Sequence, residues 1–195
     1  MKKIILAILT IVSSIDCHSQ KLETEYYFIT NDTLLVDHFL TFKNDSIVLI
    51  SSVPRHMWQY FEKELKYEKQ SESLTIYVDD SLQLYNYGFS DNKKLKIEGN
   101  ALLNEFQKNL YVVRKDFAKS PDLFVKFNGK EYKVDMGESN SYGLITKSPQ
   151  KNRRLKQAMK NIDLNNYDIE LTKGFDAYKN FGYKYVFGII ELKPK

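Results

Sequence analysis

The 195-residue chain is poor in several residue types, and each shortage excludes a class of protein. The 8 glycines and 4 prolines are too few for a collagen-like or proline-rich architecture. No apolar run approaches the roughly 20 residues that a membrane-spanning helix needs, which excludes a polytopic helical membrane protein. The single cysteine is Cys17, so the chain beyond it has no disulfide, thiol nucleophile or cysteine-ligated metal site. We therefore expect stability to come from a packed core.

The composition that remains is typical of a globular protein. Hydrophobic residues make up 43% of the chain, aromatic residues 14% and charged residues 28%. A disordered chain has too few large apolar groups to offset the entropy lost on ordering, whereas this chain has enough. Because a domain commonly contains roughly 100 to 200 residues, we predict a single domain over residues 20–195.

The N-terminus has the layout of a secretory signal peptide. Lys2 and Lys3 precede an apolar run over residues 4–12, and a short polar stretch follows. Small residues suit cleavage after Ser19, which removes residues 1–19. We therefore expect an exported protein, periplasmic or extracellular, whose net charge falls from +4 to +3 because two lysines and one aspartate leave with the peptide.

Lipoprotein processing is the alternative at this terminus. The stretch Ser-Ile-Asp-Cys that ends at Cys17 resembles a degenerate bacterial lipobox. Asp16 departs from the small residue expected just before the cysteine. The two outcomes therefore stay open: a free exported protein, or one that is lipid-anchored at Cys17.

Alternating apolar residues and short turns predict mostly antiparallel strands. Asn128-Gly129 supplies the positive φ angles of a type I′ hairpin. His38 alternates with apolar residues, which predicts a core histidine, whereas we place His56 at the surface. Strands are predicted over residues 26–30, 33–42, 46–51, 74–78, 82–89, 95–99, 123–127, 130–136, 167–171 and 183–192.

Helical spacing of apolar residues predicts two to three amphipathic helices. Pro54 suits the first turn of a helix over residues 54–67. A short helix is predicted between Asn100 and residue 110, with a strand directly after it at residues 111–113, and a third helix is predicted over residues 148–162. The third has its apolar stripe at Leu155, Ala158, Met159 and Ile162. We therefore predict an α+β fold dominated by an antiparallel β-meander sheet, either open or barrel-like.

One hairpin resembles part of a known enzyme family. Residues 125–137 end in Asp135-Met136-Gly137 and resemble the hairpin that leads into the Asp-Thr/Ser-Gly motif of retropepsin-like aspartic proteases. The resemblance implies a hydrolase using Asp135. Met136 replaces the hydroxyl residue of that motif, and no second Asp-Thr/Ser-Gly supplies the partner carboxylate that shares the proton. An ordinary hairpin is the competing interpretation.

The clearest charge asymmetry lies between Ser139 and Ile162, where no acidic residue occurs. The cations there could contact anionic lipid headgroups, lipopolysaccharide phosphates or an acidic protein, or could simply face solvent. They are Lys147, Lys151, Arg153, Arg154, Lys156 and Lys160.

Aromatic residues alternate along two predicted strands, as Tyr85, Tyr87 and Phe89 and as Tyr183, Tyr185 and Phe187. Such rows can stack on sugars or line an apolar pocket. Cross-strand packing within the sheet is the alternative.

The catalytic signatures we searched for do not occur in the sequence: a glycine-rich phosphate loop, a Gly-x-Ser-x-Gly elbow, His-Glu-x-x-His and an EF-hand loop. We therefore favour a noncatalytic binding or accessory module for a protein or surface ligand, with no cofactor and no metal. An exported protein of charge +3 is a poor candidate for binding nucleic acid. The alternatives are a carrier of a small apolar or glycan ligand and a hydrolase using Asp135.

Overall fold

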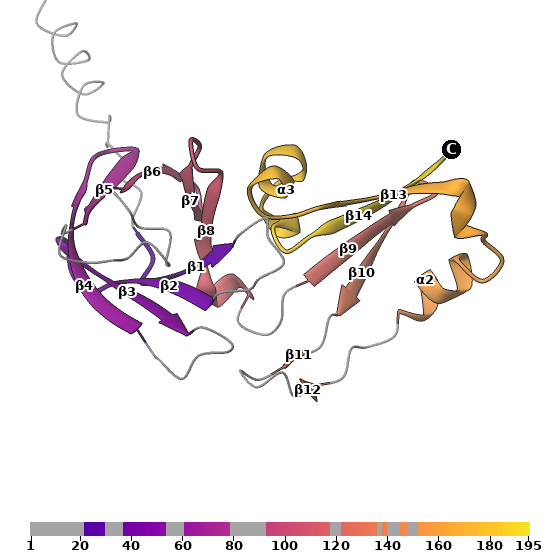
Figure 1. Ribbon diagram of the computed structural model, residues 1–195, viewed down its shortest axis with the longest axis horizontal. Coiled ribbons are helices and arrows are strands. Elements are labelled where there is room, and N and C mark those ends of the chain that lie inside the picture. The colour runs from indigo at the N-terminus through magenta and orange to yellow at the C-terminus, as the bar shows by residue number, and fades with distance from the viewer. Residues whose placement is uncertain are drawn as a thin grey trace, which may run out of the picture.

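The structure, a computed structural model, describes residues 22–29, 37–53, 61–78, 93–117, 122–135, 138–139, 145–147 and 152–195. These residues form a closed barrel, a separate four-stranded sheet and a few short helices (Figure 1). An α+β fold dominated by antiparallel pairing is therefore confirmed. In the described part of the chain, no helix is long and apolar enough to cross a membrane.

The barrel has eight strands, each antiparallel to the next along the chain, and the last pairs with the first (Figure 1, indigo to rose). Its side chains alternate between interior and exterior, as the period of two requires. The strands are β1 (Glu25–Ile29), β2 (Asp37–Phe42), β3 (Ile47–Val53), β4 (Phe61–Lys69), β5 (Ser73–Tyr77), β6 (Lys93–Glu98), β7 (Ala101–Asn104) and β8 (Asn109–Val113).

Large side chains occupy the barrel interior. Eight strands enclose a space that side chains can fill or that can hold one small ligand. Tyr26, Phe42 and Tyr67 stack edge to face there, with ring centroids 5.7 and 4.9 Å apart. The other buried members of this core are Leu40, Val48, Ile50, Leu65, Leu74, Ile76, Leu95, Ile97, Leu102, Tyr111 and Val113.

The second sheet has the order β10-β9-β14-β13, in which β14 is parallel to β9 and the other pairs are antiparallel. Asn128 and Gly129 have φ angles of 47° and 69° between β9 and β10, so the predicted hairpin is confirmed. The strands are β9 (Asp122–Phe127), β10 (Lys130–Asp135), β13 (Tyr167–Thr172) and β14 (Ile189–Pro194), and a small separate pair is formed by β11 (Glu138–Ser139) and β12 (Ile145–Lys147).

Two α-helices, α2 (Arg153–Ala158) and α3 (Gly174–Phe181), flank this second sheet. Helix α2 packs on one apolar face of the sheet, against Val125, Phe127 and Leu192. Short 3₁₀ turns complete the described helical elements: η2 (Arg114–Phe117), η3 (Leu164–Asn166) and η4 (Tyr183–Tyr185).

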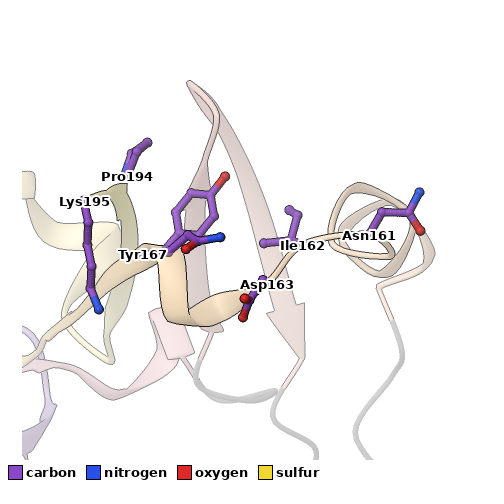
Figure 2. Close-up of a pocket in the computed structure, with 7 residues that line it drawn as sticks. Asn161, Ile162, Asp163, Tyr167, Pro194 and Lys195 are labelled. Carbon is purple, nitrogen blue, oxygen red and sulfur yellow. The ribbon is translucent and has the colours of Figure 1, made fainter.

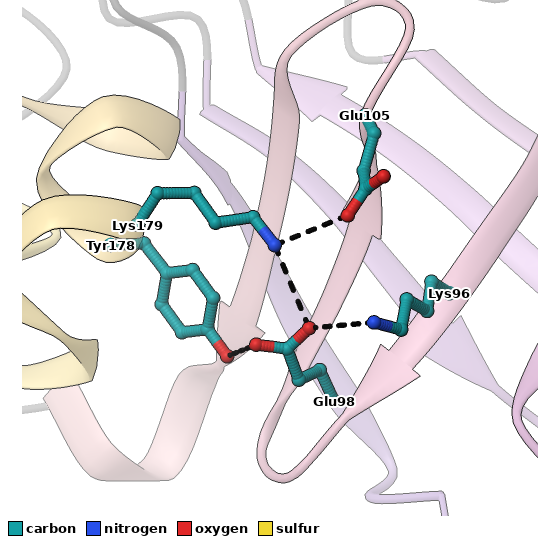
Figure 3. Close-up of polar contacts among 5 residues, drawn as sticks. All are labelled: Lys96, Glu98, Glu105, Tyr178 and Lys179. Carbon is teal, nitrogen blue, oxygen red and sulfur yellow. Dashed lines mark hydrogen bonds and ion pairs between the residues drawn. The ribbon is translucent and has the colours of Figure 1, made fainter.

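Helix α3 and η4 join the second sheet to the outside of the barrel. Phe175 and Val186 pack against the outward-facing Leu103 and Val112 of β7 and β8. Polar contacts reinforce this joint. Figure 3 shows Glu98 of β6 accepting hydrogen bonds from Tyr178 at 2.9 Å and Lys96 at 3.1 Å, while Lys179 lies between Glu98 and Glu105.

The prediction of a helix over residues 54–67 is wrong for its described part, because residues 61–69 form strand β4. Leu65 and Tyr67 are buried there, while Glu64, Lys66 and Glu68 between and beside them are exposed. Pairing with β3 and β5 stabilises the strand, so the tertiary context overrides the local helical spacing. Residues 54–60, including His56, lie outside the described residues.

The predicted helix after Asn100 is also wrong, since β7, a tight turn and β8 occupy this segment. Leu102 faces the barrel interior, and Leu103 faces α3. A strand buried on both faces has consecutive apolar residues, which the spacing alone cannot distinguish from a helix.

The C-terminal prediction needs two corrections. The strand expected over 183–192 begins only at Ile189, and the aromatic residues at its start lie in η4 and the loop beyond it. Tyr183 and Phe187 pack on the barrel instead of forming a row. Helix α3, which the sequence analysis missed, precedes them. The helix predicted over 148–162 is confirmed only as the shorter α2, and its four apolar stripe residues do pack on the second sheet.

Candidate functional site

Helix α2 is held in one orientation on the second sheet. The Asn152 side chain caps the helix by accepting a hydrogen bond from the Leu155 amide at 2.9 Å. The same side chain donates to the Lys133 carbonyl oxygen of β10 at 2.7 Å. Leu155 and Ala158 pack on the sheet. The apolar side of α2 is therefore used within the fold, and its charged side faces solvent.

The charged side of α2 carries Arg153, Arg154, Lys156 and, just beyond the helix, Lys160. All four side chains are exposed, and none forms an ion pair with another described residue. By contrast, Lys184 of η4 forms an ion pair with Glu131 of β10 at 2.9 Å. We call these four residues the α2 basic surface.

A groove runs between α2 and β10. It has a volume of about 570 Å³ and is lined by Lys130, Glu131, Tyr132, Arg154, Gln157 and Ala158. Three consecutive residues of one strand line it, so the groove follows the strand. Among the described strands β10 pairs only with β9, so its other side is an edge of the sheet.

Glu131 is the one carboxylate among the described residues that line the groove, and its negative charge is already compensated. Glu131 accepts hydrogen bonds from Tyr185 at 2.5 Å and from Lys184 at 2.9 Å. Burial opposes the charged form, but these hydrogen bonds outweigh it and lower the pKa of Glu131. With Lys130 and Arg154 on either side, the groove is an electropositive site that suits an anionic group.

A second hollow lies by β13, the opposite edge strand of the sheet, between η3 and the C-terminus (Figure 2). Its volume is about 490 Å³. The Asp163 carboxylate accepts a hydrogen bond from the Asn165 amide at 3.0 Å, and the Lys195 ammonium donates to the Asn165 carbonyl oxygen at 2.8 Å. These polar groups therefore hold the local turn together. The lining residues are Asn161, Ile162, Asp163, Asn166, Tyr167, Pro194 and Lys195.

The remaining predicted binding residues are not brought together by the described structure. Lys151, Tyr85 and Tyr87 lie outside the described residues. Lys147 belongs to β12, opposite Glu138, but its side chain is outside the described part.

Asp135 ends strand β10 and lies opposite Asp122 of β9. Asp122 is paired with Lys133 at 2.5 Å, which is not the proton-sharing arrangement of an aspartic protease dyad. Met136 and Gly137 lie outside the described residues.

A group of polar side chains inside the barrel was not predicted from the sequence. Lys93, His38 and Tyr111 are only 3%, 4% and 1% exposed. The burial of His38 itself is as predicted. Lys93 follows a predicted turn and precedes the strand predicted over residues 95–99, so the sequence interpretation gave it no role. Its alternation with Leu95 and Ile97 was the signal that places it on the inner face.

A comparison of the chain with protein-family models, with curated proteins and with solved structures finds no match. Within the described ranges, no group of three or more His, Cys, Asp or Glu side chains is placed to hold a metal ion. The geometry of the described residues therefore carries the functional argument.

Proposed function

We propose that this protein is a noncatalytic, exported binding module, and that the α2 basic surface and the adjoining groove bind an acidic segment of a partner protein. The observation that carries the proposal is the set of four exposed cations on α2 that form no ion pair with another described residue, beside a groove along the edge of β10. Uncompensated charge of one sign attracts the opposite sign and speeds association.

The groove favours an extended peptide. The outer side of β10 is a sheet edge that can pair with an added strand beyond the Lys133 carbonyl, which Asn152 already occupies, while Arg154 and Lys130 can contact carboxylates on that strand. Tyr132 adds an apolar contact in the same groove. A strand that alternates acidic and small residues fits both requirements.

A protein partner is favoured over a lipid surface because the apolar stripe of α2 is occupied. Interfacial helices bind membranes by burying an apolar face below the headgroups. Here Leu155, Ala158 and Met159 pack on the second sheet, so α2 offers a membrane only its charges. The N-terminal layout of residues 1–19 supports export.

The proposal is tested with a fluorescein-labelled peptide of alternating glutamate and threonine, titrated with the protein and followed by fluorescence anisotropy. The double variant Arg154→Glu/Lys156→Glu is expected to weaken binding at least tenfold. The control Lys66→Glu/Lys94→Glu makes the same change in net charge on exposed barrel positions, so it measures the effect of net charge alone. It should leave the affinity for the peptide within about twofold of wild type.

Vesicles containing phosphatidylglycerol are the second arm of the experiment. Tight binding to these vesicles, with no binding of the acidic peptide, would replace the protein partner with an anionic membrane surface. Equal losses in the α2 variant and in the barrel control would contradict any specific site on α2.

A further inference from the structure

Strand β13 forms one edge of the second sheet, and β10 forms the other (Figure 1). β13 pairs with β14 over all six of its residues without a shift in register, and no other described strand pairs with it. Proteins usually protect such an edge with a proline, a bulge or a covering element. The described β13 has neither a proline nor a bulge, so its backbone is available to another strand.

The hydrogen-bond pattern shows which residues of β13 face this edge. Just before the strand, the Lys195 amide donates to the Asn166 carbonyl oxygen at 3.0 Å. In an antiparallel pair, the residues that bond to the neighbouring strand alternate with residues that do not. Every second residue after Asn166 therefore bonds to β14, and Ile169 and Leu171 direct their backbone N–H and C=O groups outward.

The side chains of these two outward residues are apolar and exposed. Ile169 lies opposite Leu192, and Leu171 lies opposite Ile190, so both lie on the face of the sheet where α2 packs. Ile169 is nevertheless 56% exposed and Leu171 is 49% exposed. Adjacent exposed apolar side chains, unlike scattered single ones, indicate a contact surface.

The other face of β13 is acidic. Asp168 and Glu170 are both exposed there. Lys193 of β14 forms an ion pair with Glu170 at 3.0 Å, whereas Asp168 forms none with another described residue. A strand added to this edge would therefore meet apolar side chains on one face and negative charge on the other.

These charges disfavour a second copy of β13 as the added strand. Antiparallel pairing centred on Ile169 would put Asp168 directly opposite Glu170 of the second copy. Pairing centred on Glu170 would put two glutamates opposite each other. Like charges directly opposite destabilise a strand pair, whereas a lysine or arginine at the same position stabilises it. The charge pattern therefore favours a basic partner strand.

We propose that the free edge of β13 binds an extended strand of a partner protein in which apolar and basic side chains alternate. The backbone groups of Ile169 and Leu171 hold the strand, and its apolar side chains cover these two residues. Its basic side chains lie beside Asp168 and Glu170. In this mode of recognition, main-chain hydrogen bonds give affinity and alternate side chains give specificity. The site lies on the opposite edge from β10 and takes the opposite charge, so it is independent of the α2 basic surface.

The test is fluorescence anisotropy of a fluorescein-labelled peptide of alternating lysine and valine, titrated with the full chain. The control peptide has the same residues in two blocks, with all lysines before all valines. It has the same charge but cannot place one residue type on each face of a strand. We expect the alternating peptide to bind and the block peptide to bind about tenfold more weakly.

Substitutions at the outward residues test the edge itself. Ile169→Pro removes an outward N–H and leaves the bonds to β14, since an edge strand accepts proline where the N–H faces solvent. It should weaken binding of the alternating peptide about tenfold. Ile169→Thr/Leu171→Thr removes the apolar contacts, keeps strand propensity and should weaken binding similarly, which keeps the test valid if the proline variant fails to fold. Leu164→Thr, at a 46% exposed residue outside β13, should bind as wild type does.

A further pair of variants tests the charges. Asp168→Asn/Glu170→Gln should weaken binding of the alternating peptide several-fold and reduce its dependence on salt. Asp45→Asn/Glu72→Gln makes the same change in net charge at exposed positions of the barrel, so it measures the effect of net charge alone. We expect this control to stay within about twofold of wild type.

The inference is overturned if the alternating and block peptides bind equally, because charge alone would then explain the binding. It is also overturned if every folded β13 variant binds the alternating peptide as wild type does. Sedimentation of the wild-type chain covers the remaining occupant: a dimer that Ile169→Thr/Leu171→Thr dissociates would replace the partner protein with a second copy of this chain. A wild-type monomer agrees with the proposal.

Discussion

The Asn152 side chain links two elements that are 19 positions apart in sequence: it donates to the Lys133 carbonyl oxygen at 2.7 Å and accepts from the Leu155 amide at 2.9 Å. One amide therefore caps α2 and fixes the helix on β10. This link sets the width of the groove between them and aims the α2 basic surface away from the sheet.

Replacement of Asn152 by alanine removes both contacts. Loss of an N-cap typically costs about 1 kcal/mol, and the lost bond to Lys133 adds to this, so we expect Asn152→Ala to lower the free energy of unfolding by about 1–2 kcal/mol. Urea unfolding followed by circular dichroism measures the change. Asn100→Ala, which removes an exposed bond to Asp116, is the matched control and should cost less than about 0.5 kcal/mol. Equal effects of the two substitutions would contradict the role given to Asn152.

Tyr183 connects the C-terminal segment to the barrel. Its hydroxyl accepts a hydrogen bond from the Val113 amide at 3.0 Å and donates to Asp116 at 3.0 Å. Because Tyr183→Phe leaves the Val113 amide without this acceptor, we expect it to destabilise the protein by about 1–3 kcal/mol. Tyr77→Phe, which removes an exposed hydrogen bond to Glu68, should cost less than about 1 kcal/mol under the same urea titration.

His38 makes stability depend on pH in the mildly acidic range. Burial and the nearby Lys93 lower its pKa from 6.5 to about 4, so between these values the unfolded chain binds the proton and the native chain does not. Stability therefore falls as the pH drops from 6.5 towards 4, by about 2 kcal/mol between pH 6.5 and pH 5. His38→Gln should remove this part of the slope when unfolding midpoints are compared at the two pH values. An unchanged slope would show that His38 is protonated in the native state.

Lys93 produces a second slope at alkaline pH. Burial lowers its pKa from 10.5 to about 8, so the native chain releases the proton before the unfolded chain does. Stability should therefore rise above pH 8, by about 2 kcal/mol between pH 8 and pH 9.5 relative to Lys93→Met, in which this contribution is absent. Lys94→Met, on the outer face, is expected to follow wild type. If the free energies of unfolding of wild type and Lys93→Met change in parallel with pH, the pKa of Lys93 is not lowered by burial.

Local chemistry was enough to predict part of the fold. The Asn128-Gly129 turn was predictable because few other dipeptides adopt two successive positive φ angles. The apolar stripe that begins at Leu155 was predictable because α2 has one buried and one exposed side, which also indicated the basic residues of the candidate site.

The rest depends on pairing between distant segments. Leu102 and Leu103 are both buried only because the barrel interior lies on one side of β7 and α3 on the other. The groove requires β10 beside α2, and the Asn152 link that places them together has no local sequence signal. The alternation of Lys93 with Leu95 and Ile97 indicates the inner face of β6, but the depth of its burial depends on the closed barrel around it.

The central claim is that the α2 basic surface holds an acidic partner. Native mass spectrometry of the protein released gently from its own cells tests this most directly, with wild type and Arg154→Glu/Lys156→Glu compared side by side. The account predicts a stoichiometric complex with one acidic protein for wild type, which is lost in the α2 variant and kept in Lys66→Glu/Lys94→Glu. A bare wild-type chain, or a partner that stays bound to the α2 variant, would contradict it.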